Sequence, residues 1–74
     1  MHLSPATDIV NSQATLIDWA KAYEEGEPAV EDFEYDALVR YLQRLKAKHV
    51  QEWEEHSFPE FEDGSWAYTG LFYQ

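Results

Sequence analysis

Apolar residues recur every three or four positions along two stretches of the chain. The face of the first stretch is formed by Ile9, Val10, Gln13, Leu16, Ile17, Ala20 and Tyr23. The face of the second is formed by Phe33, Ala37, Leu38, Tyr41, Leu42, Leu45, His49 and Trp53. This spacing is typical of amphipathic helices. It predicts a mainly α fold with two long antiparallel helices, whose buried residues include Leu16, Ile17, Ala20, Leu38, Leu42 and Leu45.

Capping residues place the ends of the predicted helices. Ser4 and Pro5 are typical of an N-cap and a first helical position, and Gly26 is typical of a C-terminal cap. The first helix is therefore expected from about Pro5 to Glu24, and Pro28 prevents its continuation. The second begins near Glu31 and reaches at least Lys48. No residue from 49 to 56 interrupts its pattern, so a single helix of about 39 Å is allowed there.

The C-terminal tail, residues 57 to 74, is rich in aromatic side chains. Pro59, the Asp63-Gly64 turn signal and the alternation of Trp66 and Tyr68 predict either a short β-hairpin or an aromatic segment wrapped on the helices. Residues 71 to 73 are apolar and are expected to pack on the helices or on a partner. The whole chain, residues 1–74, is expected to form one small domain.

The charge is strongly acidic and unevenly distributed. Fifteen acids against five bases give a formal net charge of −10, which argues against direct binding to nucleic acid or to an anionic membrane. Thirteen acids lie in two blocks without a base: Glu24, Glu25, Glu27, Glu31, Asp32, Glu34 and Asp36, and then Glu52, Glu54, Glu55, Glu60, Glu62 and Asp63. The absence of cysteine leaves the compartment open. No signal peptide and no apolar run long enough to span a membrane is visible, so a cytoplasmic protein is expected, in a bacterial host cell if it is phage-encoded.

Candidate chemistry is concentrated at the start of the second helix. Asp32 and Asp36 are four residues apart, so their carboxylates stand on neighbouring turns with Tyr35 beside them. One interpretation is an ordinary acidic helix start, because acids there oppose the positive end of the helix dipole. The three histidines have no metal-site spacing, and the chain has neither an EF-hand loop nor a nucleophile–base arrangement. We therefore expect no metal site and no enzyme activity.

Tyr23, Pro28 and the run from Asp32 to Leu45, DFEYDALVRYLQRL, resemble the N-terminal Ia domain of NAD-dependent DNA ligases. That family has an aromatic pair, a proline and then Asp-x-Glu-Tyr-Asp-x-Leu on a long helix. The resemblance implies a helical cap that holds the nicotinamide mononucleotide half of NAD. Asp32, Tyr35 and Asp36 would then contact nicotinamide and its ribose, and Tyr23 would occupy the second aromatic position.

The chain also departs from the ligase pattern. Ala22 stands where the family has a stacking tyrosine, and Val50 follows His49 where the family usually has a proline that ends the helix. The Lys-x-Asp-Gly adenylation motif is absent from the sequence. By the resemblance, the chain would be a detached cap, a subunit fragment or a protein that reuses the helical pair for binding.

Three functional hypotheses follow, and the sequence favours the first. In that hypothesis a small acidic protein, similar to phage-encoded inhibitors, imitates DNA and blocks the basic surface of a nuclease, repair enzyme, polymerase or CRISPR complex. A helical first block would place one acid about every 3 Å, close to the phosphate spacing of about 3.4 Å along one DNA strand. Tyr35 and Trp53 would be its apolar anchors. The predicted partner-binding residues are Glu31, Asp32, Glu34, Tyr35, Asp36, Glu52, Trp53, Glu54 and Glu55.

The second hypothesis is a cap that binds NAD or nicotinamide mononucleotide together with another chain, through Tyr23, Asp32, Tyr35 and Asp36. The third is an acidic helical domain with an unrelated protein partner. The first hypothesis requires no cofactor, whereas the second requires a nicotinamide nucleotide.

Overall fold

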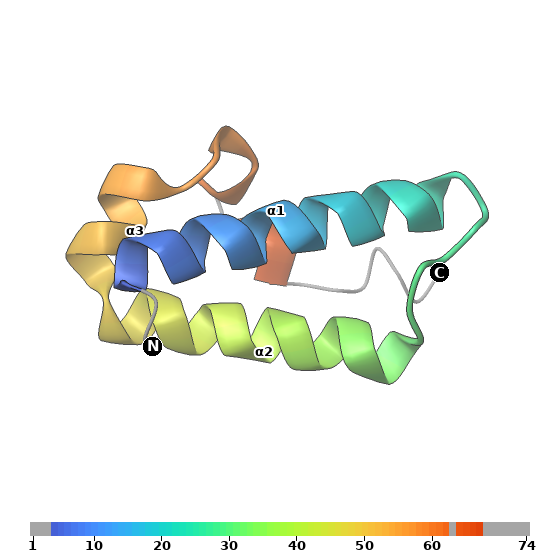
Figure 1. The fold of residues 1–74 in the computed structure, drawn as a ribbon, viewed down its shortest axis with the longest axis horizontal. Helices are drawn as coiled ribbons and strands as arrows, with labels where there is room; N and C mark the ends of the chain where they lie inside the picture. Colours follow the sequence, from blue (N-terminus) through green and yellow to red (C-terminus); the bar gives the residue numbers. More distant parts are fainter. Residues whose placement is uncertain (1–3, 63, 68–74) are drawn as a thin grey trace.

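A computed structural model describes residues 4–62 and 64–67 and is mainly α, as the sequence predicts. The elements are α1 (Pro5–Glu24), α2 (Asp32–Lys48) and α3 (Val50–His56), followed by the short 3-10 helices η1 (Pro59–Phe61) and η2 (Gly64–Ala67). α1 and α2 lie side by side and antiparallel, and α3 turns back beside the start of α1 (Figure 1). Within the described residues there is no strand. Gly64 of the predicted hairpin begins η2, and residues 68–74 of that prediction lie outside the description.

The predicted limits of α1 are confirmed. Ser4 Oγ accepts a hydrogen bond of 3.2 Å from the Thr7 backbone N–H, and Pro5 is the first helical residue. At the other end Gly26 has φ +81°, a conformation that glycine adopts without strain. The Gly26 N–H donates to the Tyr23 carbonyl and the Glu27 N–H to the Ala22 carbonyl. This pair of bonds is a Schellman motif, which ends the helix and turns the chain toward α2.

The second helix reaches Lys48, as predicted, but the continuation to residue 56 that the pattern allowed does not occur. His49 has φ −128° and ψ 61°, outside the helical region, and it separates α2 from α3. The break leaves no backbone group of His49 unsatisfied, because its N–H donates to the Leu45 carbonyl and its carbonyl accepts from the Trp53 N–H. The change of direction packs α3 on α1 and buries Trp53, which a straight helix would carry past the end of α1. Burying so large an aromatic surface favours the broken arrangement.

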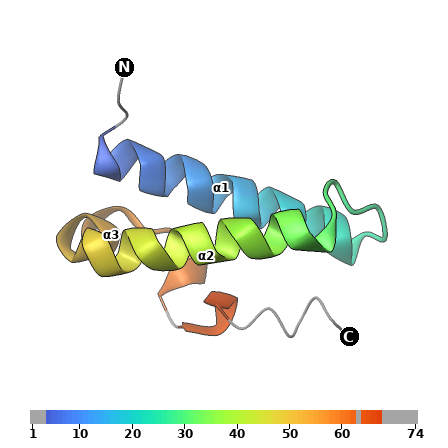
Figure 2. The same ribbon diagram turned by 90° about the horizontal axis from the view of Figure 1, so that it is seen from below.

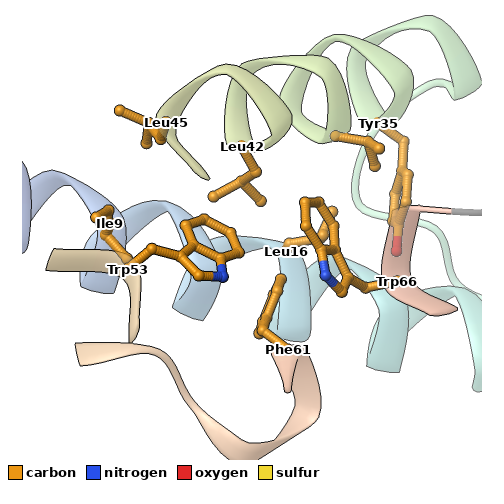
Figure 3. Packing of buried hydrophobic residues seen from close by; sticks show 9 residues of the cluster. Ile9, Leu16, Tyr35, Leu42, Leu45, Trp53, Phe61 and Trp66 are labelled. Atoms are coloured by element: carbon orange, nitrogen blue, oxygen red, sulfur yellow. The ribbon is translucent and has the colours of Figure 1, made fainter. Parts of the chain in front are cut away.

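The core face of α2 is rotated relative to the predicted stripe. Phe33 is 68% exposed and Tyr41 39% exposed, although both were expected on the apolar face, whereas Tyr35 and Val39 are buried. The core consists of Ile9, Leu16, Tyr35, Val39, Leu42, Leu45, Trp53, Phe61 and Trp66 (Figure 3). The predicted core residues Leu16, Leu42 and Leu45 are buried, and Ile17, Ala20 and Leu38 are partly buried against this cluster.

The described part of the tail packs as an aromatic wedge on the helices. Trp53 of α3, Phe61 of η1 and Trp66 of η2 form three mutual ring contacts, with centroids 5.2 to 6.1 Å apart. Their tilted and edge-on geometries are those that aromatic quadrupoles favour. This cluster closes the side of the helical pair that two helices alone would leave open, and it provides much of the apolar burial in a short chain.

One buried polar side chain holds the tail in place. Gln13 of α1 is completely buried, and its Nε2 donates to Ser57 Oγ at 2.9 Å. Its Oε1 accepts from the Phe58 backbone N–H at 2.9 Å. Ser57 Oγ in turn donates to the Trp53 carbonyl at the end of α3. Both ends of the amide are therefore satisfied, and α1 is joined to the segment that follows α3.

Candidate functional site

A shallow pocket lies where the chain passes from α1 to α2. It is lined by Trp19, Tyr23, Pro28, Ala29, Val30, Asp32, Tyr35 and Asp36. The Schellman turn at Gly26 brings the end of α1 and the start of α2 together, so residues distant in sequence share one hollow. The hollow has a volume of about 280 Å³ including its open mouth, and its enclosed part has room for about one water molecule.

Tyr35 forms the floor of this pocket and belongs equally to the core. Its side chain is only 4% exposed, and its ring centroid lies 6.4 Å from that of Trp19 at a tilt of 45°. Burial, and secondarily the negative charge of Glu24, raises the pKa of the Tyr35 phenol well above its usual value of 10. The phenol therefore stays protonated across the physiological range and can act as a hydrogen-bond donor.

The residues that the ligase resemblance selects are gathered at this pocket. Asp32 is exposed at its mouth, while Tyr23 and Asp36 are half-buried in its walls. Trp19 is a lining residue that sequence reasoning missed. It lies four residues before Tyr23, and two aromatic residues at that spacing share one face of α1. Ala22 is not among the lining residues.

The two acidic blocks do not form one continuous charged face. The first lies at the α1–α2 turn, whereas Glu52, Glu54 and Glu55 of the second lie on α3, at the other end of the helical pair (Figure 1). The first block is also not one helix, because residues 25 to 31 connect α1 to α2. The regular spacing of about 3 Å assumed for a helical block therefore does not apply.

The exposed acids of the predicted binding surface are Glu31, Asp32, Glu34, Glu54 and Glu55, whereas Asp36 and Glu52 are half-buried. The two predicted apolar anchors are not on that surface. Tyr35 and Trp53 are each only 4% exposed and contact the core, so their role as exposed anchors is corrected. The role of anchor was assigned to them because interfaces favour Tyr and Trp, but in the fold both rings are buried in the core.

Other candidate chemistry finds no support in the described part of the chain. No group of three or more His, Asp or Glu side chains there is arranged to hold a metal ion. Among the described helices, none combines the length and apolar character needed to cross a membrane.

A short stretch of the chain is similar to a protein named DNA ligase 1 from Deinococcus deserti. The two share 63% identity over 29 residues, which is 39% of this chain and 4% of the ligase. The chain therefore contains a ligase-related segment and spans a very small part of that relative. No protein-family profile matches the chain. Likewise, no solved structure matches it.

Proposed function

We propose that this chain is a small nucleotide-holding module that binds the nicotinamide riboside part of NAD or of nicotinamide mononucleotide at the α1–α2 turn, together with a second protein. The observation that carries the proposal is the grouping of Tyr23, Asp32, Tyr35 and Asp36 around one pocket. The similarity of a short segment to a DNA ligase supports the same assignment.

The side chains at the pocket suit a cationic ring that carries hydroxyl groups. The oxidised nicotinamide ring is positively charged when attached to ribose, and the carboxylates of Asp32 and Asp36 would stabilise that charge. The same carboxylates can accept hydrogen bonds from ribose hydroxyls or from the carboxamide. The rings of Trp19 and Tyr23 offer apolar surface for stacking.

The pocket suggests why a second protein is needed. Its enclosed part holds about one water molecule, so a nicotinamide ring would rest on the mouth and leave its other face open. The phosphate of the nucleotide would also meet the acids of the first block, which would repel it. A partner with a basic surface would cover the ring and hold the phosphate, while this chain supplies the wall that favours the cation.

This reasoning predicts an order of affinities for the isolated chain. Nicotinamide riboside should bind more tightly than nicotinamide mononucleotide, because it has the cationic ring without the phosphate. Both should bind weakly, with dissociation constants of about 1 mM or above, because only one wall is present. Titrations followed by the indole N–H resonance of Trp19 would measure both.

Two matched variants test the site. Asp36→Asn preserves the shape of the side chain and removes its charge, and it should abolish the shift of the Trp19 resonance. Glu34→Gln removes one charge from an exposed position on the same turn that does not line the pocket, and it should leave binding within about twofold. Equal losses in the two variants would indicate only a general charge effect. The absence of any shift at about 10 mM riboside would refute the site.

Docking on a basic protein surface is the second candidate. It is favoured by the exposure of Glu31, Glu34, Glu54 and Glu55 in segments that contain no base. In this case binding to a nucleic-acid enzyme should weaken steeply with salt, since exposed charges are screened beyond about 8 Å at physiological ionic strength. Reversing Glu54 and Glu55 should slow association, whereas Arg44→Gln should not. A complex that is insensitive to salt and to the reversals would refute a DNA-mimicking role.

A further inference from the structure

A single residue, His49, joins α2 to α3. Figures 1 and 2 show this junction at the end of the helical pair where α2 ends and α1 begins. Neither glycine nor proline occurs from residue 32 to 58, so the sequence on both sides of the junction contains no helix breaker. The elements that follow, α3, η1 and η2, are here called the C-terminal unit. This unit is therefore attached to α2 through one hinge residue.

The hinge interrupts the helical hydrogen bonds over one turn. Residues 50 to 52 form the first turn of α3, so their N–H groups have no carbonyl one turn earlier within that helix, and His49 provides no side-chain cap. In a continuous helix these three groups would donate to the carbonyls of residues 46 to 48. The bonds on either side, from the His49 N–H to Leu45 and from the Trp53 N–H to His49, already have helical spacing. Straightening the hinge would therefore complete one helix from Asp32 to His56.

Straightening is unfavourable within a single chain. It carries the C-terminal unit past the end of α1 and exposes the aromatic wedge together with the faces of α1 and α2 that the wedge covers. It also breaks both hydrogen bonds of the Gln13 amide. The helix dipoles favour the break as well, because Lys46 and Lys48 lie in the last turn of α2 and Glu52 in the first turn of α3. An isolated chain therefore stays closed, with its unit packed on its own helices.

We propose that two copies of this chain exchange their C-terminal units, with both hinges straightened. Each unit then packs on α1 and α2 of the other copy. It makes there the core contacts and the Gln13 hydrogen bonds that it makes in the closed chain. Three backbone hydrogen bonds are added at each hinge. Exchange of an identical element is a low-cost route to a dimer, because the surfaces that meet are already complementary.

Concentration decides between the closed chain and the exchanged dimer. In the closed chain the unit is tethered beside its site, which favours that form until a second chain reaches a competing concentration. The net charge of −10 makes two copies repel each other, and salt screens this repulsion. The dimer is therefore favoured at high chain concentration in the presence of salt. The pocket at the α1–α2 turn lies at the opposite end of the helical pair, so the exchange does not rest on nucleotide binding (Figure 1).

The first measurement detects the dimer in the unaltered chain. The chain is refolded from urea at about 1 mM in about 0.15 M salt and examined by sedimentation velocity. A species with twice the mass of 8.7 kDa should appear beside the monomer. Refolding at about 10 μM should give the monomer alone, because association is then far less favourable.

The second measurement shows which contacts cross between the chains. Isotope-labelled and unlabelled chains are refolded together, and the dimer is examined by isotope-filtered nuclear Overhauser spectroscopy. A cross-peak between the Phe58 amide proton of one chain and the Gln13 side chain of the other is expected, because these groups are hydrogen-bonded in the closed chain. The Tyr41 hydroxyl donates to Asp8, which joins α2 to α1. Cross-peaks between those two residues should stay within one chain and are the internal control.

Hinge variants test the straightened helix. Alanine forms helices better than glycine by about fivefold in equilibrium constant, and each dimer has two hinges. His49→Ala should therefore give a dimerisation constant about twentyfold above that of His49→Gly. Gln43→Ala and Gln43→Gly are the matched pair, because Gln43 is exposed and helical in both forms. Their two dimerisation constants should agree within about twofold.

Three results would overturn the proposal. The first is a chain that remains monomeric after refolding at about 1 mM. The second is a dimer in which the contact of Phe58 with Gln13 stays within one chain, which would indicate association through an outer surface. The third is a ratio between the His49 variants no larger than that between the Gln43 variants, since the hinge would then not control the exchange.

Discussion

The amide of Gln13 offers the sharpest test of how this short chain is held together. Gln13 is completely buried on α1, yet both of its hydrogen bonds go to residues 57 and 58, beyond α3. The aromatic wedge of Phe61 and Trp66 follows directly in the chain. These bonds fix the path of the tail, so removal of the amide should loosen the aromatic wedge as well as the local contacts.

The loss of stability expected on removing the amide follows from the hydrogen bonds that it makes. Gln13→Leu preserves approximate size but leaves the Phe58 backbone N–H without its acceptor, which costs about 1–3 kcal/mol when the group remains buried. Gln13→Ala should cost about 1 kcal/mol more, because it also removes buried side-chain volume. A chain of this length is expected to have a stability of about 4–11 kcal/mol, so the loss is a large fraction of the total.

Urea denaturation followed by tryptophan fluorescence measures this loss, and thermal unfolding should show a decrease in Tm of about 4–8 °C for each kcal/mol. Gln43→Leu is the matched control, because Gln43 is an exposed glutamine in α2. A double-mutant cycle with Ser57→Ala should show coupling between the two side chains, which are 2.9 Å apart. If Gln13→Leu and Gln43→Leu change stability equally, within about 0.5 kcal/mol, the structural role assigned to the amide is wrong.

Three further predictions concern the core, the turn and the alkaline limit of stability. Leu42→Ala should cost about 2–5 kcal/mol in urea denaturation, because Leu42 is completely buried, and a loss below 1 kcal/mol would contradict that packing. Gly26→Ala should cost about 1–2 kcal/mol from its φ of +81° alone, since no atom would contact the added methyl, whereas Gly64→Ala, which has neither a positive φ nor a close neighbour, should cost much less. Because burial raises the folded-state pKa of Tyr35 above the unfolded value of about 10, its contribution to stability should be complete below pH 10 and lost as the pH rises further. Tyr35→Phe should reduce this alkaline loss relative to the unaltered chain, and identical pH profiles of the two would show that Tyr35 is not responsible.

The candidate site was only partly predictable from the sequence. The acid–tyrosine pattern and the ligase resemblance selected Tyr23, Asp32, Tyr35 and Asp36, and the fold places all four around one pocket. The sequence nevertheless favoured the acidic-surface hypothesis, which assumed a continuous charged helix with exposed Tyr35 and Trp53. That assumption failed because the chain turns after Gly26 and because both rings were needed in the core. Trp19 was missed because its relation to the pocket depends on the packing of α1 against α2.

Local signals in the sequence were sufficient for the limits of α1 and for the mainly helical class. Ser4, Pro5 and Gly26 act through bonds to neighbours within a few residues, so no tertiary contact is needed to interpret them. The break at His49 and the rotation of α2 were decided by the tertiary structure alone. α2 carries apolar residues on more than one side, and helical spacing cannot choose among them until α1 and the aromatic wedge occupy one. Likewise, nothing near His49 requires a break. The break is favoured because it buries Trp53 in the core with Ile9, more than forty positions earlier in the chain. The free energy gained by this burial exists only once the chain has folded.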